Sequence, residues 1–319
     1  MSKMMVRCAG LLAVGLLAAA CGISGTTPIG VATQIFVTDR LNHRVVRVRD
    51  FAGLGWTVLG SLGSGTGQFN EPFGVFMNAA GRIFIADSLN DRIVRMSDMT
   101  GAGWTTFGST CGGVNQFNRP TAVFADTTGR IYVVDSGNNR IVRIDDMTGA
   151  GWTTFGSTGG GVGEFSGPTG ISIDGSNRIH VADTGNNRIV RFADMTGAGW
   201  TSYGTAGGGT GQFAGPLWVF VDAGGNIFVT DTGNNRVVRI TDMSGAGWTS
   251  FGTAGGGTNQ FSQPSAIFID DGSRINVADT GNNRIVRFTD MIGADWTAYG
   301  SAGSGTDQFN SPTGIFVRQ

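Results

Sequence analysis

The chain has 319 residues, of which 55 are glycine and 40% are hydrophobic, and its formal net charge at pH 7 is −1. Abundant glycine without a collagen triplet indicates many tight turns between short strands rather than disorder. The near-neutral charge argues against a nucleic-acid-binding protein, which normally presents a strongly basic face, so we expect no nucleic-acid partner.

The N-terminal segment is typical of a bacterial export signal. Lys3 and Arg7 precede or flank an apolar run at positions 9–20, whose twelve residues are too few to span a bilayer comfortably as a helix. Three alanines then precede Cys21. We therefore predict a signal peptide over residues 1–20, which is not part of the folded protein.

The segment LAAACG at positions 17–22 resembles the lipobox of bacterial lipoproteins. In that family the cysteine thiol is acylated and becomes the new N-terminus. Ala18 stands where leucine is usual, and ordinary signal-peptidase cleavage after Ala20 is the alternative. The resemblance implies lipidation at Cys21, a lipidated tether over residues 21–30 and a membrane-anchored location in the cell envelope, either periplasmic or at the cell surface.

A repeat of 48 residues fills the rest of the chain without insertions. Such fixed-period similarity dictates the architecture of a fold. An aspartate, a tryptophan and a proline each recur six times at this spacing. The repeated residues are Asp39, Asp87, Asp135, Asp183, Asp231 and Asp279; Trp56, Trp104, Trp152, Trp200, Trp248 and Trp296; and Pro72, Pro120, Pro168, Pro216, Pro264 and Pro312.

One unit, Pro168–Gly215, has the pattern of four short strands. We expect them at residues 169–174, 178–183, 188–192 and 200–204, because β-branched and aromatic runs there are bounded by Gly, Asn and Asp. Six four-stranded units are typical of propeller blades, which hide their edges by radial repetition. The sequence therefore predicts an all-β fold, a six-bladed β-propeller.

The two ends of the repeat region predict how the ring closes. The chain enters at a second strand, Ile35–Asp39, and finishes with a lone first strand, Pro312–Val317. Every blade has four strands only if the C-terminal strand completes the first blade. We therefore predict one closed propeller domain over residues 31–319. An open solenoid is the alternative, but the terminal units lack polar capping variants.

The unit pattern G-x-G-Q-F-x-x-P-x-G-[IV] followed by I-[FY]-V-x-D-[ST]-G-N-N-R-[IV]-V-R resembles the NHL repeat. It occurs in Gly161–Arg191, with Glu164 and His180 as departures, and in Gly209–Arg239, with Trp218 as the departure. The resemblance implies the propeller fold. The family includes RNA-binding propellers, sensor domains of membrane kinases and a peptide-amidating lyase, so it does not define an activity.

Residues present in every unit are interpreted as structural. Asp183 and Arg188, and likewise Arg191 and Asp194, are expected to form turn caps and ion pairs. Gly185 and the two asparagines after it suit backbone positions with unusual φ. The repeated tryptophans are expected to pack the blades.

A second set of acids lies between the predicted first and second strands. A calcium site built from Asp126, Asp174, Asp222 and Asp270 is conceivable, but these residues are better explained as turn starters. The three cysteines form no Cys-x-x-Cys pair that would indicate zinc.

Departures from the repeat are the candidates for function, because one ligand cannot bind six identical blades equally. Trp218 stands where every other unit has glycine or alanine, near the predicted mouth of the axial channel. Ser172 replaces phenylalanine, while His180 and Asn276 occupy an aromatic position. The candidate ligand-binding residues are Trp218, Phe73, Glu71, Arg119, Leu217, His43 and Asp91.

The chain has no recognisable catalytic constellation. We therefore expect an extracytoplasmic binding or scaffolding propeller that recognises a protein, peptide or small ligand on its loop-rich face. The alternative is a propeller enzyme of the lyase or lactonase type with an atypical site. The amidating lyase of the NHL family uses a zinc held by several histidines, and here only His43 and His180 exist, so no metal or other cofactor is expected.

Overall fold

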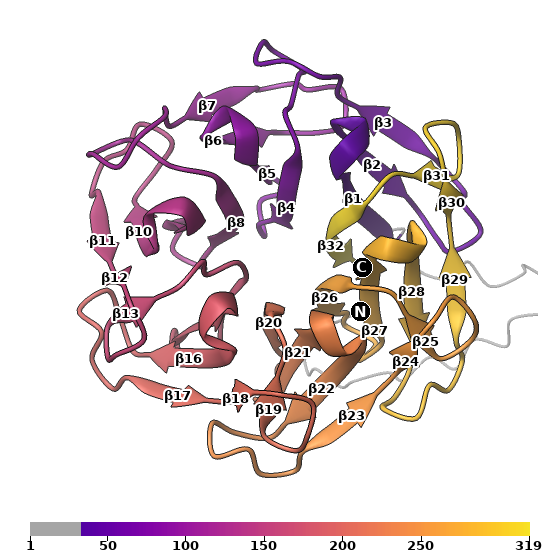
Figure 1. Ribbon diagram of the computed structural model, residues 1–319. Helices are drawn as coiled ribbons and strands as arrows, with labels where there is room; N and C mark the ends of the chain where they lie inside the picture. Colours follow the sequence, from indigo (N-terminus) through magenta and orange to yellow (C-terminus); the bar gives the residue numbers. More distant parts are fainter. Residues whose placement is uncertain (1–32) are drawn as a thin grey trace, which may run out of the picture. The chain divides into compact units, whose positions relative to one another are not determined.

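The computed structural model describes residues 33–319, which form six blades arranged in a ring (Figure 1). The predicted signal peptide and tether, with Cys21, lie outside the described residues. Among residues 33–319, no helix combines the length and the apolar character that crossing a membrane requires.

Each blade is a four-stranded antiparallel sheet, and its strands are counted here from the centre of the ring outward. Blade 1 contains β32 (Pro312–Arg318), β1 (Gln34–Asp39), β2 (Arg44–Val48) and β3 (Thr57–Leu59); blade 2 contains β4 (Pro72–Met77), β5 (Ile83–Asp87), β6 (Arg92–Met96) and β7 (Thr105–Phe107); blade 3 contains β8 (Pro120–Ala125), β9 (Ile131–Asp135), β10 (Arg140–Ile144) and β11 (Thr153–Phe155). Blade 4 contains β14 (Ile171–Ile173), β15 (Ile179–Asp183), β16 (Arg188–Phe192) and β17 (Thr201–Tyr203); blade 5 contains β20 (Pro216–Val221), β21 (Ile227–Asp231), β22 (Arg236–Ile240) and β23 (Thr249–Phe251); blade 6 contains β26 (Pro264–Ile269), β27 (Ile275–Asp279), β28 (Arg284–Phe288) and β29 (Thr297–Tyr299).

Shorter elements lie between these strands. Parallel pairs join β12 (Ser157–Thr158) to β13 (Glu164–Phe165), β18 (Thr205–Ala206) to β19 (Gln212–Phe213), β24 (Thr253–Ala254) to β25 (Gln260–Phe261), and β30 (Ser301–Ala302) to β31 (Gln308–Phe309). A 3-10 turn follows each second strand: η1 (Arg40–Asn42), η2 (Ser88–Asn90), η3 (Ser136–Asn138), η4 (Thr184–Asn186), η5 (Thr232–Asn234) and η6 (Thr280–Asn282).

The ring has two faces, because antiparallel strands reverse direction at every turn. We call the face with η1–η6 and the connections between blades the upper face. The lower face carries the turns between first and second strands and between third and fourth strands.

The ring closes through the two ends of the described chain. β1 lies between β2 and β32, and Ile35 pairs with Val317. The backbone N–H of Gly314 donates to the Thr38 hydroxyl at 2.6 Å. The predicted closure by the C-terminal strand is confirmed, as is the all-β arrangement of four-stranded blades.

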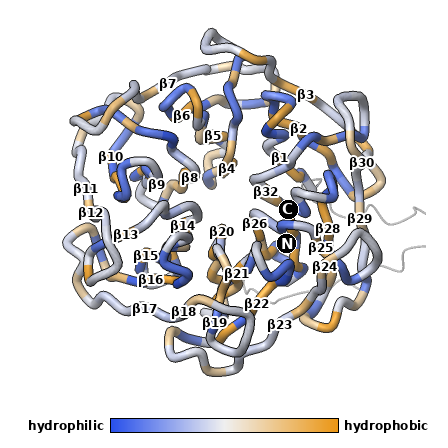
Figure 2. The backbone as a smooth tube through the Cα atoms, in the orientation of Figure 1, coloured by the Kyte–Doolittle hydropathy of each residue, from blue (hydrophilic) through white to orange (hydrophobic). Residues whose placement is uncertain are grey.

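The hydrophobic core lies between neighbouring blades. Figure 2 shows hydrophobic colour on parts of the inner and middle strands, such as β20–β22, pale colour on the outer strands, and hydrophilic colour in turns of the upper face. In blade 4, the fully buried Phe165 packs against Trp200 with ring centroids 5.5 Å apart, and the guanidinium of Arg188 lies 5.7 Å from the Trp200 ring. The repeated tryptophan therefore packs the blade, as expected.

A buried aspartate at the end of each second strand organises the upper face. In blade 4, Oδ1 of Asp183 accepts the backbone N–H of Ser166 at 2.8 Å, and Oδ2 accepts Nε of Arg188 at 2.7 Å. Arg188 then donates through Nη1 to the carbonyl of Gly160 at 2.7 Å and through Nη2 to that of Glu164 at 2.9 Å. This aspartate–arginine latch ties the blade to the connection that arrives from the preceding blade.

The same latch occurs in every blade. In blade 1 it spans the closure, because Asp39 accepts the N–H of Asn310 at 2.6 Å and Arg44 donates to the carbonyl of Gln308 at 2.8 Å. The six pairs are Asp39–Arg44, Asp87–Arg92, Asp135–Arg140, Asp183–Arg188, Asp231–Arg236 and Asp279–Arg284.

Two details of the repeat differ from the sequence-based interpretation. Within residues 33–319, Arg191 and Asp194 form no ion pair; Asp194 instead accepts the N–H and hydroxyl of Thr196 in its own turn. Gly185 does not have a positive φ, and only Asn187 of this turn does, at 54°. Gly185 is needed for space, since a Cβ there would lie 2.7 Å from the carbonyl oxygen of Ser166.

Replacement of the latch arginine tests this account. We expect Arg188→Lys to lower the free energy of unfolding by about 2–3 kcal/mol, because a lysine cannot supply the fork of donors that reaches four acceptors. Arg191→Lys, three residues along the same strand, is the matched control and should change it by less than about 0.5 kcal/mol. Urea unfolding of both variants measures the difference, and equal losses would contradict the latch.

Candidate functional site

Residues that depart from the repeat meet on the upper face between blades 1, 2 and 3. Arg40, Glu71, Phe73, Leu89 and Arg119 line one cavity of about 80 Å³, together with two smaller side chains. We call these five residues the upper-face cluster. Three of them, Glu71, Phe73 and Arg119, were selected from the sequence, and the structure brings these three together.

Within the cluster, one arginine is paired and the other is free. Nε of Arg40 donates to Oε2 of Glu71 at 2.9 Å, and its guanidinium lies 5.9 Å from the Phe73 ring. Arg119 is exposed, and its guanidinium has no ion-pair partner among residues 33–319. The cluster therefore presents a guanidinium without an ion-pair partner beside apolar surface.

The backbone at Glu71 and Arg119 adopts the left-handed conformation, with φ values of 50° and 52°. The equivalent residues in blades 4 and 5 are Gly167 and Gly215, at φ values of 53° and 57°. A side chain at such a position costs about 1 kcal/mol relative to glycine. Two charged residues therefore occupy places where glycine is conformationally easier.

His43 and Asp91 lie nearby but have a structural task. Nδ1 of His43 accepts the backbone N–H of Glu71 at 3.1 Å, and Oδ1 of Asp91 accepts that of Arg119 at 2.7 Å. The equivalent asparagines make the same contact in the other blades, for example Asn139 with Gly167 at 2.7 Å. These two candidates hold the cluster in position from the preceding blade.

Trp218 has a different place from the one expected. Its side chain is only 8% exposed, and a Cβ on Gly74 would lie 3.2 Å from its Cη2 atom. Gly74 belongs to β4, three blades around the ring from β20, so the indole crosses the central channel and closes it. Trp218 was a candidate ligand-binding residue near the channel mouth, but its side chain is buried, because small residues at the five equivalent positions leave an axial space that the indole fills. Leu217, half-buried on β20, lies outside the upper-face cluster.

Below Trp218, five phenylalanines at equivalent positions of the first strands surround the axis. Successive ring centroids lie 4.4–5.4 Å apart, which is the range of favourable aromatic pairs. In spatial order this phenylalanine arc consists of Phe220, Phe268, Phe316, Phe76 and Phe124. Ser172 takes the sixth position, and a void of about 30 Å³ separates the arc from Trp218.

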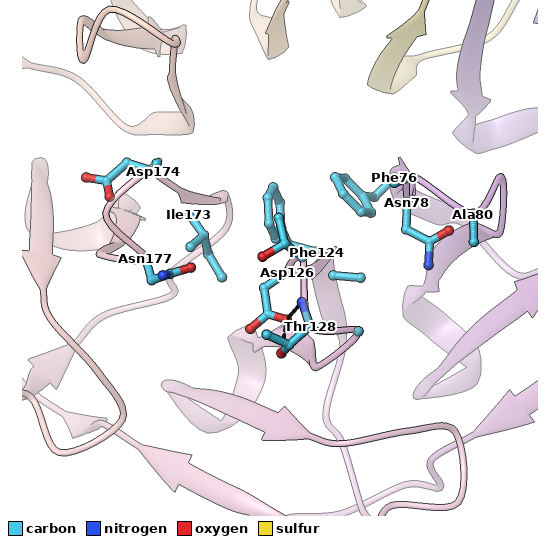
Figure 3. A pocket seen from close by; sticks show the side chains of 14 residues that line it. Phe76, Asn78, Ala80, Phe124, Asp126, Thr128, Ile173, Asp174 and Asn177 are labelled. Atoms are coloured by element: carbon cyan, nitrogen blue, oxygen red, sulfur yellow. Dashed lines mark hydrogen bonds between the residues drawn. The ribbon is translucent and has the colours of Figure 1, made fainter.

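The lower face carries a larger hollow over blades 2, 3 and 4. Its volume is about 530 Å³, and Figure 3 shows Phe76 and Phe124 side by side in it, with Ile173 next to them. The rim consists of the turns between first and second strands, including Asn78, Asp126, Thr128, Asp174 and Asn177. We call this hollow the lower-face cup.

Both carboxylates of the cup rim are fully engaged. Burial raises the pKa of the Asp126 carboxyl, but hydrogen bonds from Thr128 and Arg130 outweigh it and leave the pKa below its usual range. Burial also raises the pKa of the Asp174 carboxyl, but hydrogen bonds from His180, Arg178 and the backbone of its own turn outweigh burial and hold that pKa well below its usual range. The two aspartates start turns, as predicted, and each is paired with an arginine four residues later, at 2.8 Å in both cases.

His180 is buried under this rim. Burial lowers the pKa of its imidazole, although the hydrogen bond and the charge of Asp174 oppose that shift. Nε2 lies 3.0 Å from Oδ2 of Asp174, so the neutral ring donates through Nε2. Nδ1 is buried and has no hydrogen-bond partner among the described residues. His180 is therefore a neutral support for Asp174.

Neither face assembles a metal centre. Within residues 33–319, no three side chains of His, Cys, Asp or Glu are grouped so that they could hold an ion. Cys111 is an exposed free thiol.

Comparison with known proteins addresses the architecture. A family model described as a 6-bladed beta-propeller, DUF5128, matches residues 121–202. The chain is a six-bladed β-propeller. No curated protein matches its sequence.

Solved structures share the propeller fold at low sequence identity. The nidogen/laminin complex matches with a TM-score of 0.67 and 17% identity, over 89% of this chain and 98% of that chain. A protein of unknown function from Bacteroides caccae gives a TM-score of 0.65 and 12% identity, over 90% and 98%. Virginiamycin B lyase from Staphylococcus aureus gives 0.56 and 16%, over 85% and 82%. At these identities the likeness concerns the fold alone.

Sequence reasoning missed Arg40 and Leu89 of the upper-face cluster. Both are departures from the repeat and could have been found in the same way. Leu89 stands where four blades have glycine, and Arg40 stands where the five other blades have serine or threonine. The lower-face cup was missed for a different reason. Its phenylalanines recur in five blades, so they follow the repeat and do not stand out as departures from it.

The buried imidazole predicts a specific pH dependence. Because the pKa of His180 is lowered in the folded state, the unfolded chain binds more protons below its ordinary value of 6.5, and stability is lost as the pH falls. We expect the free energy of unfolding to decrease more steeply from about pH 7 to about pH 5 in the native chain than in His180→Phe. Phenylalanine is the residue of blades 1, 2 and 5 at this position, Phe36, Phe84 and Phe228. Parallel slopes in urea titrations across this range would contradict the assignment.

Proposed function

We propose that the protein is a non-catalytic binding or scaffolding propeller that recognises a protein or peptide segment through the upper-face cluster. The observation that carries the proposal is the convergence of departures from the repeat. Arg40, Glu71, Phe73, Leu89 and Arg119 come from three blades and line one cavity. Differences scattered by drift have no reason to converge on one place in the ring.

The size of the cavity favours a macromolecular partner. Small-molecule sites typically enclose roughly 300–1,000 Å³. The cavity of about 80 Å³ suits one inserted side chain instead. Leu41 and Leu89, which are 43% and 38% exposed, extend the apolar surface where four blades have glycine. An apolar side chain of the partner therefore fits this place.

The charge of the cluster indicates which residue of the partner should lie beside the inserted apolar side chain. Glu71 neutralises Arg40, while Arg119 has no partner in the described part of the chain. A carboxylate on the partner would form a charge-assisted hydrogen bond with Arg119. The proposed ligand is a segment that presents an apolar residue beside an aspartate or glutamate.

A lyase or lactonase reaction is less well supported by the geometry. His43 accepts a backbone N–H through Nδ1, and His180 is buried against Asp174. Trp218 is buried and reaches across the axis to Gly74, so it offers no accessible group at the upper mouth of the ring.

Reversion of the cluster to the residues of the other blades tests the proposal. We expect Arg119→Gly to weaken binding of peptides with an apolar–glutamate pair by about tenfold or more, since it removes a charged hydrogen bond. Its fold should persist, because Gly167 and Gly215 occupy this backbone conformation. Gln263→Gly in blade 6, at a φ of 51°, is the matched control and should bind like the parent.

The measurement is fluorescence anisotropy with a synthetic peptide library in which the glutamate is replaced by lysine in half of the members. Preference for the glutamate peptides, lost in Arg119→Gly, supports the proposal. Equal binding of both sets, or equal affinity of the two variants, would overturn it.

We also propose that the protein acts outside the cytoplasm, anchored to the envelope membrane by acylation of Cys21. The support is the sequence of the first 21 residues, with its basic start, apolar run and final cysteine. A single acyl chain binds membranes only marginally, so stable anchoring needs the several chains that lipoproteins carry.

Cell fractionation tests the anchor. Cys21→Ser should move the protein out of the membrane fraction or block its processing, while Cys111→Ser, at an exposed cysteine of the ring, should leave the fractionation unchanged. Mass spectrometry should find an acylated N-terminal Cys21. An unmodified mature N-terminus at Cys21 would refute the anchor.

A further inference from the structure

The lower-face cup is a second site that the upper-face cluster does not use. It lies on the opposite face of the ring, and Trp218 with the phenylalanine arc separates the two. Its volume of about 530 Å³ falls within the range of small-molecule sites, roughly 300–1,000 Å³. The lower-face cup therefore has room for a whole small molecule, whereas the upper-face cavity suits a single side chain.

The floor of the cup is apolar and aromatic. Phe76 and Phe124 are both partly exposed, their ring centroids lie 4.4 Å apart, and Ile173 extends the surface into blade 4. Centroids this close, with the ring planes at 35°, mean that the two rings stack on each other, and the rest of their C–H-rich surface forms one apolar patch with Ile173. A ligand with a flat apolar face would lie on this floor.

The rim of the cup carries no free charge. The carboxylates of Asp126 and Asp174 accept hydrogen bonds from their own turns and pair with Arg130 and Arg178. A cationic ligand would have to displace an arginine to reach either carboxylate. An anionic ligand would meet the two acids, since Asp126 and Asp174 line the cup and Arg130 and Arg178 do not. An uncharged ligand is thus favoured.

The rim nevertheless offers neutral hydrogen-bonding groups. Asn78 uses only its Oδ1 atom, which accepts the N–H of Arg82 at 3.0 Å. Within residues 33–319, its amide donor and the side chains of Thr127 and Asn177 make no hydrogen bond to the protein. These groups lie around an apolar floor, so they match a ligand whose edge carries hydroxyl or amide groups.

We propose that the lower-face cup binds a neutral saccharide of about one or two rings. A pyranose combines the required features, because its C–H groups form a flat apolar face and its hydroxyls point outward around the edge. The ring lies on Phe76 and Phe124, and the hydroxyls reach Asn78 and Asn177. No charged group takes part, so the affinity does not depend on salt.

Binding of the full mature protein to neutral mono- and disaccharides, by isothermal titration and saturation-transfer NMR, tests the proposal. Phe124→Ala should weaken binding about tenfold or more, because it removes half of the aromatic floor. Phe268→Ala is the matched control: this phenylalanine occupies the equivalent position in blade 6, away from the cup. Affinity should stay constant between about 0.05 and about 0.5 M salt.

A second variant protects the test against loss of fold. Asn177 has a φ of 60°, and its counterparts Gly81, Gly129 and Gly225 are glycines with positive φ, so Asn177→Gly should fold like the parent. We expect it to weaken saccharide binding several-fold. Arg119→Gly, on the other face, should leave this binding unchanged, which separates the cup from the upper-face proposal.

Several results would overturn the proposal. These are the absence of binding by any neutral saccharide, a preference for uronic acids, amino sugars, quaternary ammonium compounds or flat heteroaromatic rings, and equal losses in Phe124→Ala and Phe268→Ala. Unchanged binding in Asn177→Gly would show that the rim does not contact the saccharide, which would also contradict the proposed site.

Discussion

The fully buried aspartate at the end of each second strand is the constraint on which the ring depends. A carboxylate without exposure to water is tolerated only when its oxygens are satisfied, and Asp183 meets this need with a backbone N–H, an asparagine and Arg188. The arginine in turn binds carbonyls of the connection from the preceding blade. Each blade therefore fixes the chain that enters it, and the position of every upper-face side chain follows from this.

The repeat made most of this architecture predictable. A strict spacing of 48 residues gave the number of blades, and the phase of Ile35–Asp39 against Pro312–Val317 gave the closure. The ion pair of Asp183 and Arg188 followed from charge and proximity in sequence. The second pair, Arg191 and Asp194, did not form, because a short turn satisfies the aspartate with Thr196 before any arginine is needed.

The candidate sites were less predictable, since they depend on distances across the ring. Glu71, Phe73 and Arg119 were found as departures from the repeat, and they meet because consecutive blades bring equivalent positions close together. Trp218 was the strongest departure, yet its direction toward the axis cannot be read from its place in a strand. The lower-face cup depends on the joint shape of three turns, to which no single residue gives a signal.

The indole of Trp218 fills the axis of the propeller at the level of Gly74. A Cβ at Gly74, on the far side, would lie 2.7 Å from the carbonyl oxygen of Thr121 and 3.2 Å from the tip of the indole, so a glycine at this position serves both the neighbouring blade and Trp218. The buried indole and the phenylalanine arc lie on the axis between the upper-face cluster and the lower-face cup. The protein consequently has two surfaces that are chemically separate, and a substitution that reshapes one of them leaves the contacts of the other in place.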